Sequence, residues 1–312
     1  MDEVVQEVDT PKVDTATWAT DAIDMGPLAQ YQGDPPRSVA VDALPEPPPK
    51  VLIVTTADEE HIAVLHRLAP LPGHKTLRHM AIARIPLTVG ELGGRAVLVC
   101  QTKRSNTDTF LVVSTLLGCP ELKYAIKLAF AVGNAYGAHP ATAYTAEEGQ
   151  LMGDVLLADK CISFEQGVDD CCDVIHGDGS LMHTLDSMLV RNWPKDEQAW
   201  RKVPGRPRPP RVHIGPVVSA PILQDYNVLD LLNHAQIHPH KPEGVAMEVY
   251  QIADAATRHR KLWLAANAVR NFGSIEPKTI AGHTLANTTA ADFADWLLRE
   301  HLMSQYLVGE IQ

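Results

Sequence analysis

The chain has 312 residues, of which 45% are apolar and 21% charged, and its formal net charge at pH 7 is −11. This balance is ordinary for a globular protein of one large or two small domains. The net negative charge argues against nucleic-acid partners, because a phosphate backbone requires a basic surface.

No apolar run approaches the roughly 20 residues that span a bilayer, and the acidic start MDEVVQEVDT is unlike a signal peptide. The five cysteines include no CxxC pair, so neither a disulfide framework nor a structural zinc site is expected. The sequence therefore predicts a cytoplasmic protein with reduced thiols and no membrane partner.

Residues 1–49 differ from the rest, with ten acidic residues against two basic ones and eight prolines. Such a composition buries little apolar area and favours extended, solvated chain. We therefore expect residues 1–49 to form a flexible tail or linker, and residues 50–312 to form one catalytic domain.

From residue 51 onward, short apolar runs alternate with helical patterns. VLIVTT at 51–56 predicts a buried strand, and ADEEHIAVLHRL at 57–68 predicts a helix with acidic residues in its first turn, where the helix dipole favours them. MAIARIPLTVGEL at 80–92 and RAVLVCQT at 95–102 are strand-like, and the Gly93–Gly94 pair between them predicts a hairpin turn.

The alternation continues to the end of the chain. Further strands are expected at the end of 122–133 and within 155–164, 211–223 and 262–274, with helices at 107–117 and 286–303. The charged, proline-rich residues 187–211 are interpreted as a surface insertion. Alternating strands and helices predict an α/β domain with a parallel or mixed sheet.

The stretch GVAMEVYQIADAA at 244–256 begins as an apolar run and continues as a helix that has one apolar face. Met247 and Glu248 stand at the first turn of this helix. A glutamate on a buried-looking helix needs a partner, and a sugar diol is one that suits it. The alternative is a helix-start glutamate favoured by the macrodipole.

A histidine cluster, HAQIHPHKPEG, contains His234 and His238 at i, i+4 spacing. Pro239 interrupts any helix there, and no HExxH motif accompanies the pair. We therefore expect no metal and no other cofactor.

Four segments in order resemble the nucleoside phosphorylase / methylthioadenosine (S-adenosylhomocysteine) nucleosidase superfamily. They are VLIVTTADEEHIAVL, VGNAYG followed by GDVLLADKCISF, GPVVSAPIL, and VAMEVYQIADAA. The resemblance covers about residues 50–305. It implies a three-layer α/β/α fold with a central mixed sheet, cleavage of the N-glycosidic bond between a nucleobase and ribose, and a homo-oligomer that is a dimer or higher.

The resemblance also implies roles for single residues. Glu60 matches the acid that activates the attacking water, with Glu59 as the alternative one position away. Met247 and Glu248 match the pair that packs under the ribose and binds its hydroxyls. Carboxylates near the sugar suit a transition state that develops positive charge there.

Two further segments match substrate-binding parts of the superfamily. Gly133, Asn134 and Ala135, in VGNAYG, match the turn that lets the nucleoside approach the backbone. Ser219, Ile222 and Leu223 match the segment that lines the base.

Two departures bear on the chemistry. At the end of the penultimate strand, where the superfamily places a base-protonating Asp, this chain has Asn271, which can donate a hydrogen bond but not a proton. Ala131 stands where phosphorylases place a phosphate-binding Arg, which favours water over phosphate as the nucleophile. Lys103 and Arg104 either hold the 5′-phosphates of a nucleotide or belong to a solvated loop.

Three functions remain open from the sequence. The first is an N-ribosyl hydrolase acting on a purine nucleoside or nucleotide, with Glu60 as base and Met247/Glu248 as ribose anchor. The second is a phosphate-dependent nucleoside phosphorylase. The third is a non-catalytic module that binds nucleosides or a protein partner.

Overall fold

The computed structural model describes residues 38–40, 43–102, 106–141, 149–164, 173–193, 208–220, 241–273, 280–300 and 306–307. In chain order its elements are β1 (Ser38–Ala40), β2 (Val51–Thr55), α1 (Asp58–Arg67), β3 (Leu77–Ile82), β4 (Ile85–Leu92), β5 (Arg95–Gln101), α2 (Asn106–Gly118), β6 (Leu128–Gly137), β7 (Val155–Ser163), β8 (Val174–His176), α3 (Gly179–Asn192), β9 (Val212–Ser219), β10 (Gly244–Val245), α6 (Val249–Arg258), β11 (Leu262–Asn271) and α7 (Ile280–Arg299). Within the described residues, no helix combines the length and apolarity needed to cross a bilayer.

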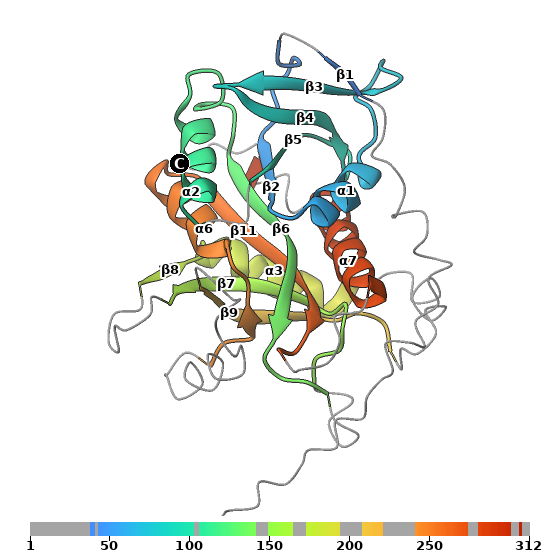
Figure 1. Ribbon diagram of the computed structural model, residues 1–312, viewed down its shortest axis with the longest axis vertical. Coiled ribbons are helices and arrows are strands. Elements are labelled where there is room, and N and C mark those ends of the chain that lie inside the picture. The colour runs from blue at the N-terminus through green and yellow to red at the C-terminus, as the bar shows by residue number, and fades with distance from the viewer. Residues whose placement is uncertain are drawn as a thin grey trace, which may run out of the picture.

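The strands form one mixed sheet with the order β1-β3-β4-β5-β2-β6-β10-β9-β7-β11, and β8 pairs with β7. Strand β6 occupies its centre (Figure 1). Strand β2 pairs in parallel with the first four residues of β6, and β10 pairs antiparallel with the last two. Strand β11 pairs in parallel along most of the length of β6.

The pairing of β11 with both β6 and β7 closes this part of the sheet on itself. The expected α/β architecture with a mixed sheet is confirmed. The three-layer arrangement is not, because the sheet curls into a ring of β6, β10, β9, β7 and β11 instead of lying as an open middle layer.

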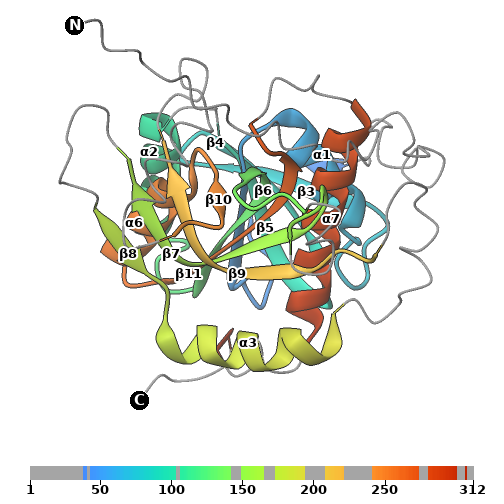
Figure 2. The same cartoon turned by 90° about the horizontal axis from the view of Figure 1, so that it is seen from below.

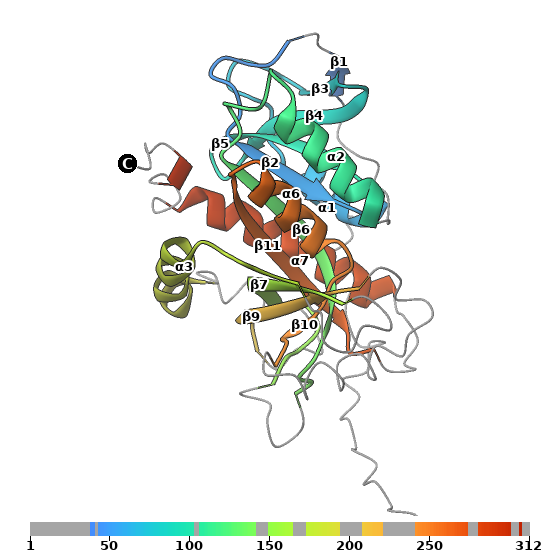
Figure 3. The ribbon, with the colours of Figure 1, turned by 90° about the vertical axis from the view of Figure 1, so that its left-hand side faces the viewer.

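Helices cover both faces of the sheet because successive strand residues point to opposite faces. Ile53 and Phe130 belong to an apolar cluster with α1, α3 and α7, whereas Leu52 and Ala129 belong to one with α2 and α6. Helices α2 and α6 lie together on one side of the sheet in Figure 3. In Figure 2, helix α3 runs below the strands, away from α2. Both sides of the sheet are therefore buried.

Most elements lie where the sequence predicts them, including the Gly93–Gly94 turn, which has positive φ angles of 57° and 73°. The strand expected at 80–92 is wrong in one respect. Ala83 and Arg84 adopt φ angles of 49° and 67° and divide it into the hairpin strands β3 and β4. Helix α3 and strand β8 were not predicted, and β1 lies inside the segment expected to be a tail, where it pairs with β3.

The parallel strands β2, β6 and β11 run in the same direction, so their carboxyl ends meet at one edge. The carboxyl ends of parallel strands are where both open α/β sheets and closed α/β barrels bind ligands. The short strand β10 leads into the same region and then into α6.

Candidate active site

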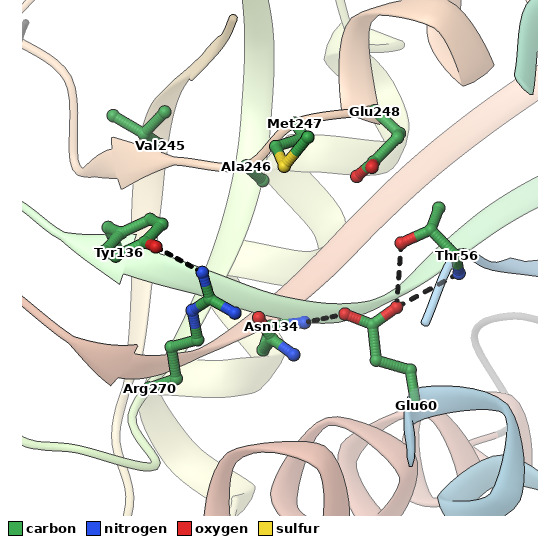
Figure 4. A pocket seen from close by; sticks show the side chains of 9 residues that line it. All are labelled: Thr56, Glu60, Asn134, Tyr136, Val245, Ala246, Met247, Glu248 and Arg270. Atoms are coloured by element: carbon green, nitrogen blue, oxygen red, sulfur yellow. Dashed lines mark hydrogen bonds between the residues drawn. The ribbon is translucent and has the colours of Figure 1, made fainter. Parts of the chain in front are cut away.

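A pocket opens where the carboxyl ends of β2, β6 and β11 meet the segment after β10 (Figure 4). It contains about 360 Å³ of empty space, part of it open to solvent. Its described lining residues come from four separate segments: Thr56, Glu60, Asn134, Tyr136, Val245, Ala246, Met247, Glu248 and Arg270. Four of the predicted site residues, Glu60, Asn134, Met247 and Glu248, are therefore brought together.

The Glu60 carboxylate is buried, with 6% of the residue exposed, and is held by four donors. Its Oε2 accepts hydrogen bonds from Thr56 N and Thr56 Oγ1, both at 3.0 Å, and from Ala57 N at 2.9 Å. Its Oε1 accepts one from Asn134 N at 3.0 Å. The bond from Ala57, the N-cap of α1, is the backward half of a capping box, with Glu60 at the N3 position.

Gly133 on β6 is required for this arrangement. A Cβ atom at position 133 would lie 2.8 Å from Glu60 Oε1 and 2.9 Å from Glu60 Cδ. Any side chain there would displace the carboxylate, since real Cβ contacts are almost never that short. The glycine therefore lets the carboxylate, rather than a ligand, approach the strand closely.

Glu59, the alternative candidate, is exposed and is not among the described residues that line the pocket. His61 follows Glu60 on α1 but is not among the described lining residues, and its Nδ1 lies 3.0 Å from Thr55 Oγ1. Burial lowers the pKa of His61, against the opposing effect of the Asp58 carboxylate. Burial therefore favours the neutral form of the ring.

Met247 and Glu248 form the turn between β10 and α6. Glu248 is the N-cap residue of α6, yet its side chain makes no capping bond, and only 8% of the residue is exposed. Ser219, at the end of β9, fixes the turn from behind: its hydroxyl donates to Met247 O at 2.5 Å and accepts from Tyr250 N at 3.3 Å. The described pocket wall does not include Ser219.

The opposite end of the pocket is formed by Tyr136 and Arg270. Strand β11 has a register shift between Val269 and Asn271, which pair with the consecutive β6 residues Ala135 and Tyr136. Arg270 is the extra residue of this bulge, and bulges re-aim side chains. Its guanidinium lies 4.3 Å from the centroid of the Tyr136 ring and donates a hydrogen bond to the Tyr136 hydroxyl.

Asn271 ends β11, and its Oδ1 accepts a hydrogen bond from Gly273 N at 3.1 Å. Among the described lining residues it is Arg270, not Asn271, that comes from this strand end. Ala135 is buried against the α2 and α6 side of the sheet. Both lie beside the pocket, and their roles in binding or catalysis stay predictions.

Four predicted site residues lie outside the described part of the chain: Lys103, Arg104, Ile222 and Leu223. The histidine cluster with His234 and His238 lies outside it too. Among the residues that are described, no group of three side chains could hold a metal ion.

Sequence reasoning missed five lining residues: Thr56, Tyr136, Val245, Ala246 and Arg270. Four of them lie inside motifs that the sequence did identify. The fifth, Arg270, is next to the predicted Asn271 but is re-aimed by the bulge in β11, which no local pattern predicts.

Comparison with known proteins rests on structure alone, because no family model and no curated protein matches the sequence. The 5′-methylthioadenosine/S-adenosylhomocysteine nucleosidase of Neisseria meningitidis, solved with methylthio-immucillin-A, is similar at 15% identity and a TM-score of 0.58, over 80% of this chain and 99% of that one. The futalosine hydrolase of Helicobacter pylori is similar at 11% identity and a TM-score of 0.59, over 80% and 97%.

The nucleosidase of S. pneumoniae, solved with the inhibitor MT-ImmA, is similar at 15% identity and a TM-score of 0.58, over 80% of this chain and 98% of that one. At these identities the likeness establishes the fold. The chain thus has the fold of these nucleosidases and of this hydrolase, which is the fold that the sequence resemblance implies.

Proposed function

We propose that the protein is an N-ribosyl hydrolase that cleaves the glycosidic bond of a purine nucleoside or nucleotide with water as the nucleophile. One observation carries the proposal: two buried carboxylates, Glu60 and Glu248, reach the same pocket from different elements (Figure 4). Burying two carboxylates is costly unless they interact with a ligand or with hydrogen-bond donors. Cleavage of a ribosyl bond develops positive charge on the sugar, which two nearby carboxylates stabilise.

Glu60 is the base in this proposal. Three of its four hydrogen bonds go to Oε2. From the described residues, Oε1 accepts only the bond from Asn134 N. An ionised carboxylate offers about four acceptor sites in all, so Oε1 has room for a water molecule. That water attacks C1′ of the ribose and gives its proton to Oε1, while the electron pair of the C1′–N bond leaves with the base.

Glu248 and Met247 hold the sugar. The Glu248 carboxylate accepts hydrogen bonds from ribose hydroxyls, and the Met247 thioether packs against the apolar side of the ring. The negative charge of both carboxylates stabilises the positive charge that develops on the ribose. Asn271, at the end of β11, donates a hydrogen bond to the leaving base.

Water is favoured over phosphate because of residue 131. Ala131 is 3% exposed and packs in the core on the α2 and α6 side of the sheet. A phosphate dianion therefore lacks a bidentate partner there. Lys103 and Arg104, which lie outside the described residues, keep a phosphate-dependent reaction as the second candidate, since two adjacent cations can serve inorganic phosphate or a 5′-phosphate.

The test is base release by the purified full chain. We would incubate it with purine nucleosides, nucleotides, methylthioadenosine and S-adenosylhomocysteine, with and without inorganic phosphate, and measure free base and sugar by chromatography. We expect free ribose or its 5′-substituted form at the same rate in both conditions. Strict phosphate dependence with a ribose 1-phosphate product would establish the phosphorylase instead. No base release from folded protein would leave a binding module.

A further inference from the structure

The pocket has two ends of opposite charge. Figure 4 shows Glu60, Thr56 and Glu248 at one end and Tyr136 with Arg270 at the other, with Asn134 between them. Among the described lining residues, Arg270 is the only cation. A bound nucleoside that places its ribose between the carboxylates therefore directs its base towards the guanidinium.

The Arg270 guanidinium is fixed by Tyr136 and makes few other polar contacts with the described residues. It stacks on the Tyr136 ring at 4.3 Å from the centroid, and its one hydrogen bond among the described residues is to the Tyr136 hydroxyl. Its Nε is buried without an acceptor in that part of the chain. Since a guanidinium carries five N–H donors and no acceptor, the described residues use only part of its hydrogen-bonding capacity.

The end of the pocket at Arg270 therefore offers mainly hydrogen-bond donors to a bound base. Arg270 cannot accept a hydrogen bond, and one acceptor site of the neighbouring Asn271 is occupied by Gly273 N. A 6-oxopurine presents two acceptors, O6 and N7, along the edge that faces such a group, which is the pattern that arginine binds in a bidentate manner. A 6-aminopurine presents an amino group in place of O6, so donor would face donor.

We propose that Arg270 binds the departing base and that the pocket is built for 6-oxopurine nucleosides. This inference rests on the proposed hydrolase function. As the C1′–N bond breaks, its electron pair moves onto the base, and the negative charge reaches O6 and N7. Arg270 stabilises that charge by hydrogen bonding and Coulomb attraction. No proton is transferred from Arg270, so the base takes up its proton from solvent after it has left.

The arrangement also accounts for the absence of an acid at the strand end. A fixed cation stabilises a leaving anion without having to give up a proton, which an arginine in a protein does not do. Base departure then does not require a group with a pKa near neutrality at position 271. Stacking on Tyr136 fixes the guanidinium plane in advance, which lowers the entropy lost on binding the base.

The decisive experiment uses nucleoside pairs that differ only at C6: inosine and adenosine, and their 5′-methylthio and 5′-phosphate counterparts. We would measure kcat/KM for base release by the wild type, Arg270→Met, Arg270→Lys and a control, Arg299→Gln, which removes an exposed arginine paired with Asp295 on α7. Binding of free hypoxanthine and adenine would be measured by calorimetry on the same proteins.

We expect the wild type to favour the 6-oxo member of each pair by at least about tenfold. Arg270→Met should lose about 10²–10³-fold with the 6-oxo substrate, as when one oxyanion donor is removed, and much less with the 6-amino substrate. Arg270→Lys should recover part of the loss, and the control should match the wild type. Calorimetry should show tighter binding of hypoxanthine than of adenine, and Arg270→Met should abolish the difference.

A wild-type preference for adenosine-type substrates, or an unchanged C6 preference in Arg270→Met, would overturn the role of Arg270 while leaving the hydrolase function intact. If no substrate releases its base, the hydrolase function fails, and calorimetry still decides whether Arg270 selects a 6-oxopurine. Should Arg270→Met be unfolded by circular dichroism, the wild-type preference and Arg270→Lys settle the question.

Discussion

The segments that carry Glu60 and Glu248 supply the same chemical group to one pocket, but they are built differently. Glu60 is fixed mainly by atoms close to it in sequence, since three of its four donor groups belong to Thr56 and Ala57. The turn of Glu248 is fixed by Ser219 through hydrogen bonds that span 28 and 31 residues. One carboxylate is thus encoded locally, and the other depends on the assembled sheet.

Glu60 and Glu248 also differ in how much they contribute to the stability of the fold. The hydrogen bonds of Glu60 tie the start of α1 to β6, so this carboxylate contributes to folding as well as to the site. Glu248 makes no capping bond in its own helix. We therefore expect Glu60 to matter for both stability and activity, and Glu248 to matter more for activity than for stability.

The largest effect should come from Glu60→Gln and Glu248→Gln, measured side by side. Both variants should lose base release, by about 10²–10⁴-fold for the loss of a general base at Glu60. Glu60→Gln should also unfold more easily, by about 1–3 kcal/mol, because its amide N–H₂ faces a backbone donor. Glu248→Gln should lower the free energy of unfolding in urea by less than Glu60→Gln does.

The control is Glu59→Gln, which changes the exposed neighbour in the same helix turn and should keep both activity and stability. Full activity in Glu248→Gln would show that the Glu248 carboxylate does not take part in the reaction. Equal unfolding free energies for Glu60→Gln and Glu248→Gln would contradict the contrast drawn between the two segments.

Asp292 offers a third case, because it is a mostly buried carboxylate outside the pocket that forms an ion pair with Arg67. Burial raises the pKa of Asp292 to about 6, against the opposing attraction of Arg67. The folded state therefore binds a proton more tightly than the unfolded state, and this group's contribution to stability is present below pH 4 and lost as the pH rises through 6.

Asp292→Asn should remove the loss of stability that the ionisation of Asp292 causes as the pH rises through 6. The variant should gain stability relative to the wild type as the pH rises from 4 to 7, by at most about 3 kcal/mol. Urea unfolding of both proteins at several pH values measures the difference, in which the other titrating groups cancel. A difference that does not change with pH would show that Asp292 titrates normally.

The smallest effect is expected for Ser219→Ala, which breaks the link between β9 and the Met247–Glu248 turn. Losing its hydrogen bonds should lower the free energy of unfolding by about 1 kcal/mol and raise KM for the nucleoside by a few-fold, with kcat less affected. Ser187→Ala, on the exposed side of α3, is the matched control. A KM equal to that of the wild type would mean that the turn keeps its position without Ser219.

Much of this fold can be predicted from local patterns. The strand at 51–55 and the helix after it follow from an apolar run and an acidic first turn, and the Met247–Glu248 pair stands at a visible change from strand to helix. Glu60 also has a local signal, since a glutamate three residues after an N-cap turns back towards it. These features depend on neighbours within four residues.

The remainder depends on contacts between distant segments. Strict alternation along β11 would place Arg270 on the face opposite Val269 and Asn271, but the bulge changes the relation between sequence position and side-chain direction. The hairpin at Ala83–Arg84 was missed because neither residue is typical of positive φ. Closure of the sheet through β6 and β11 likewise has no local signal.

The origin of the pocket in four separate segments has a consequence for biosynthesis. Glu60 leaves the ribosome about 210 residues before Arg270, and at 5–20 residues per second this interval is about 10–40 s. During that time β2 and α1 exist without β10, α6 and β11, which complete the pocket. A nascent chain that ends after α1 thus contains three of the four donors of Glu60 but no pocket in which this carboxylate can act, and activity begins only after β11 has joined β6.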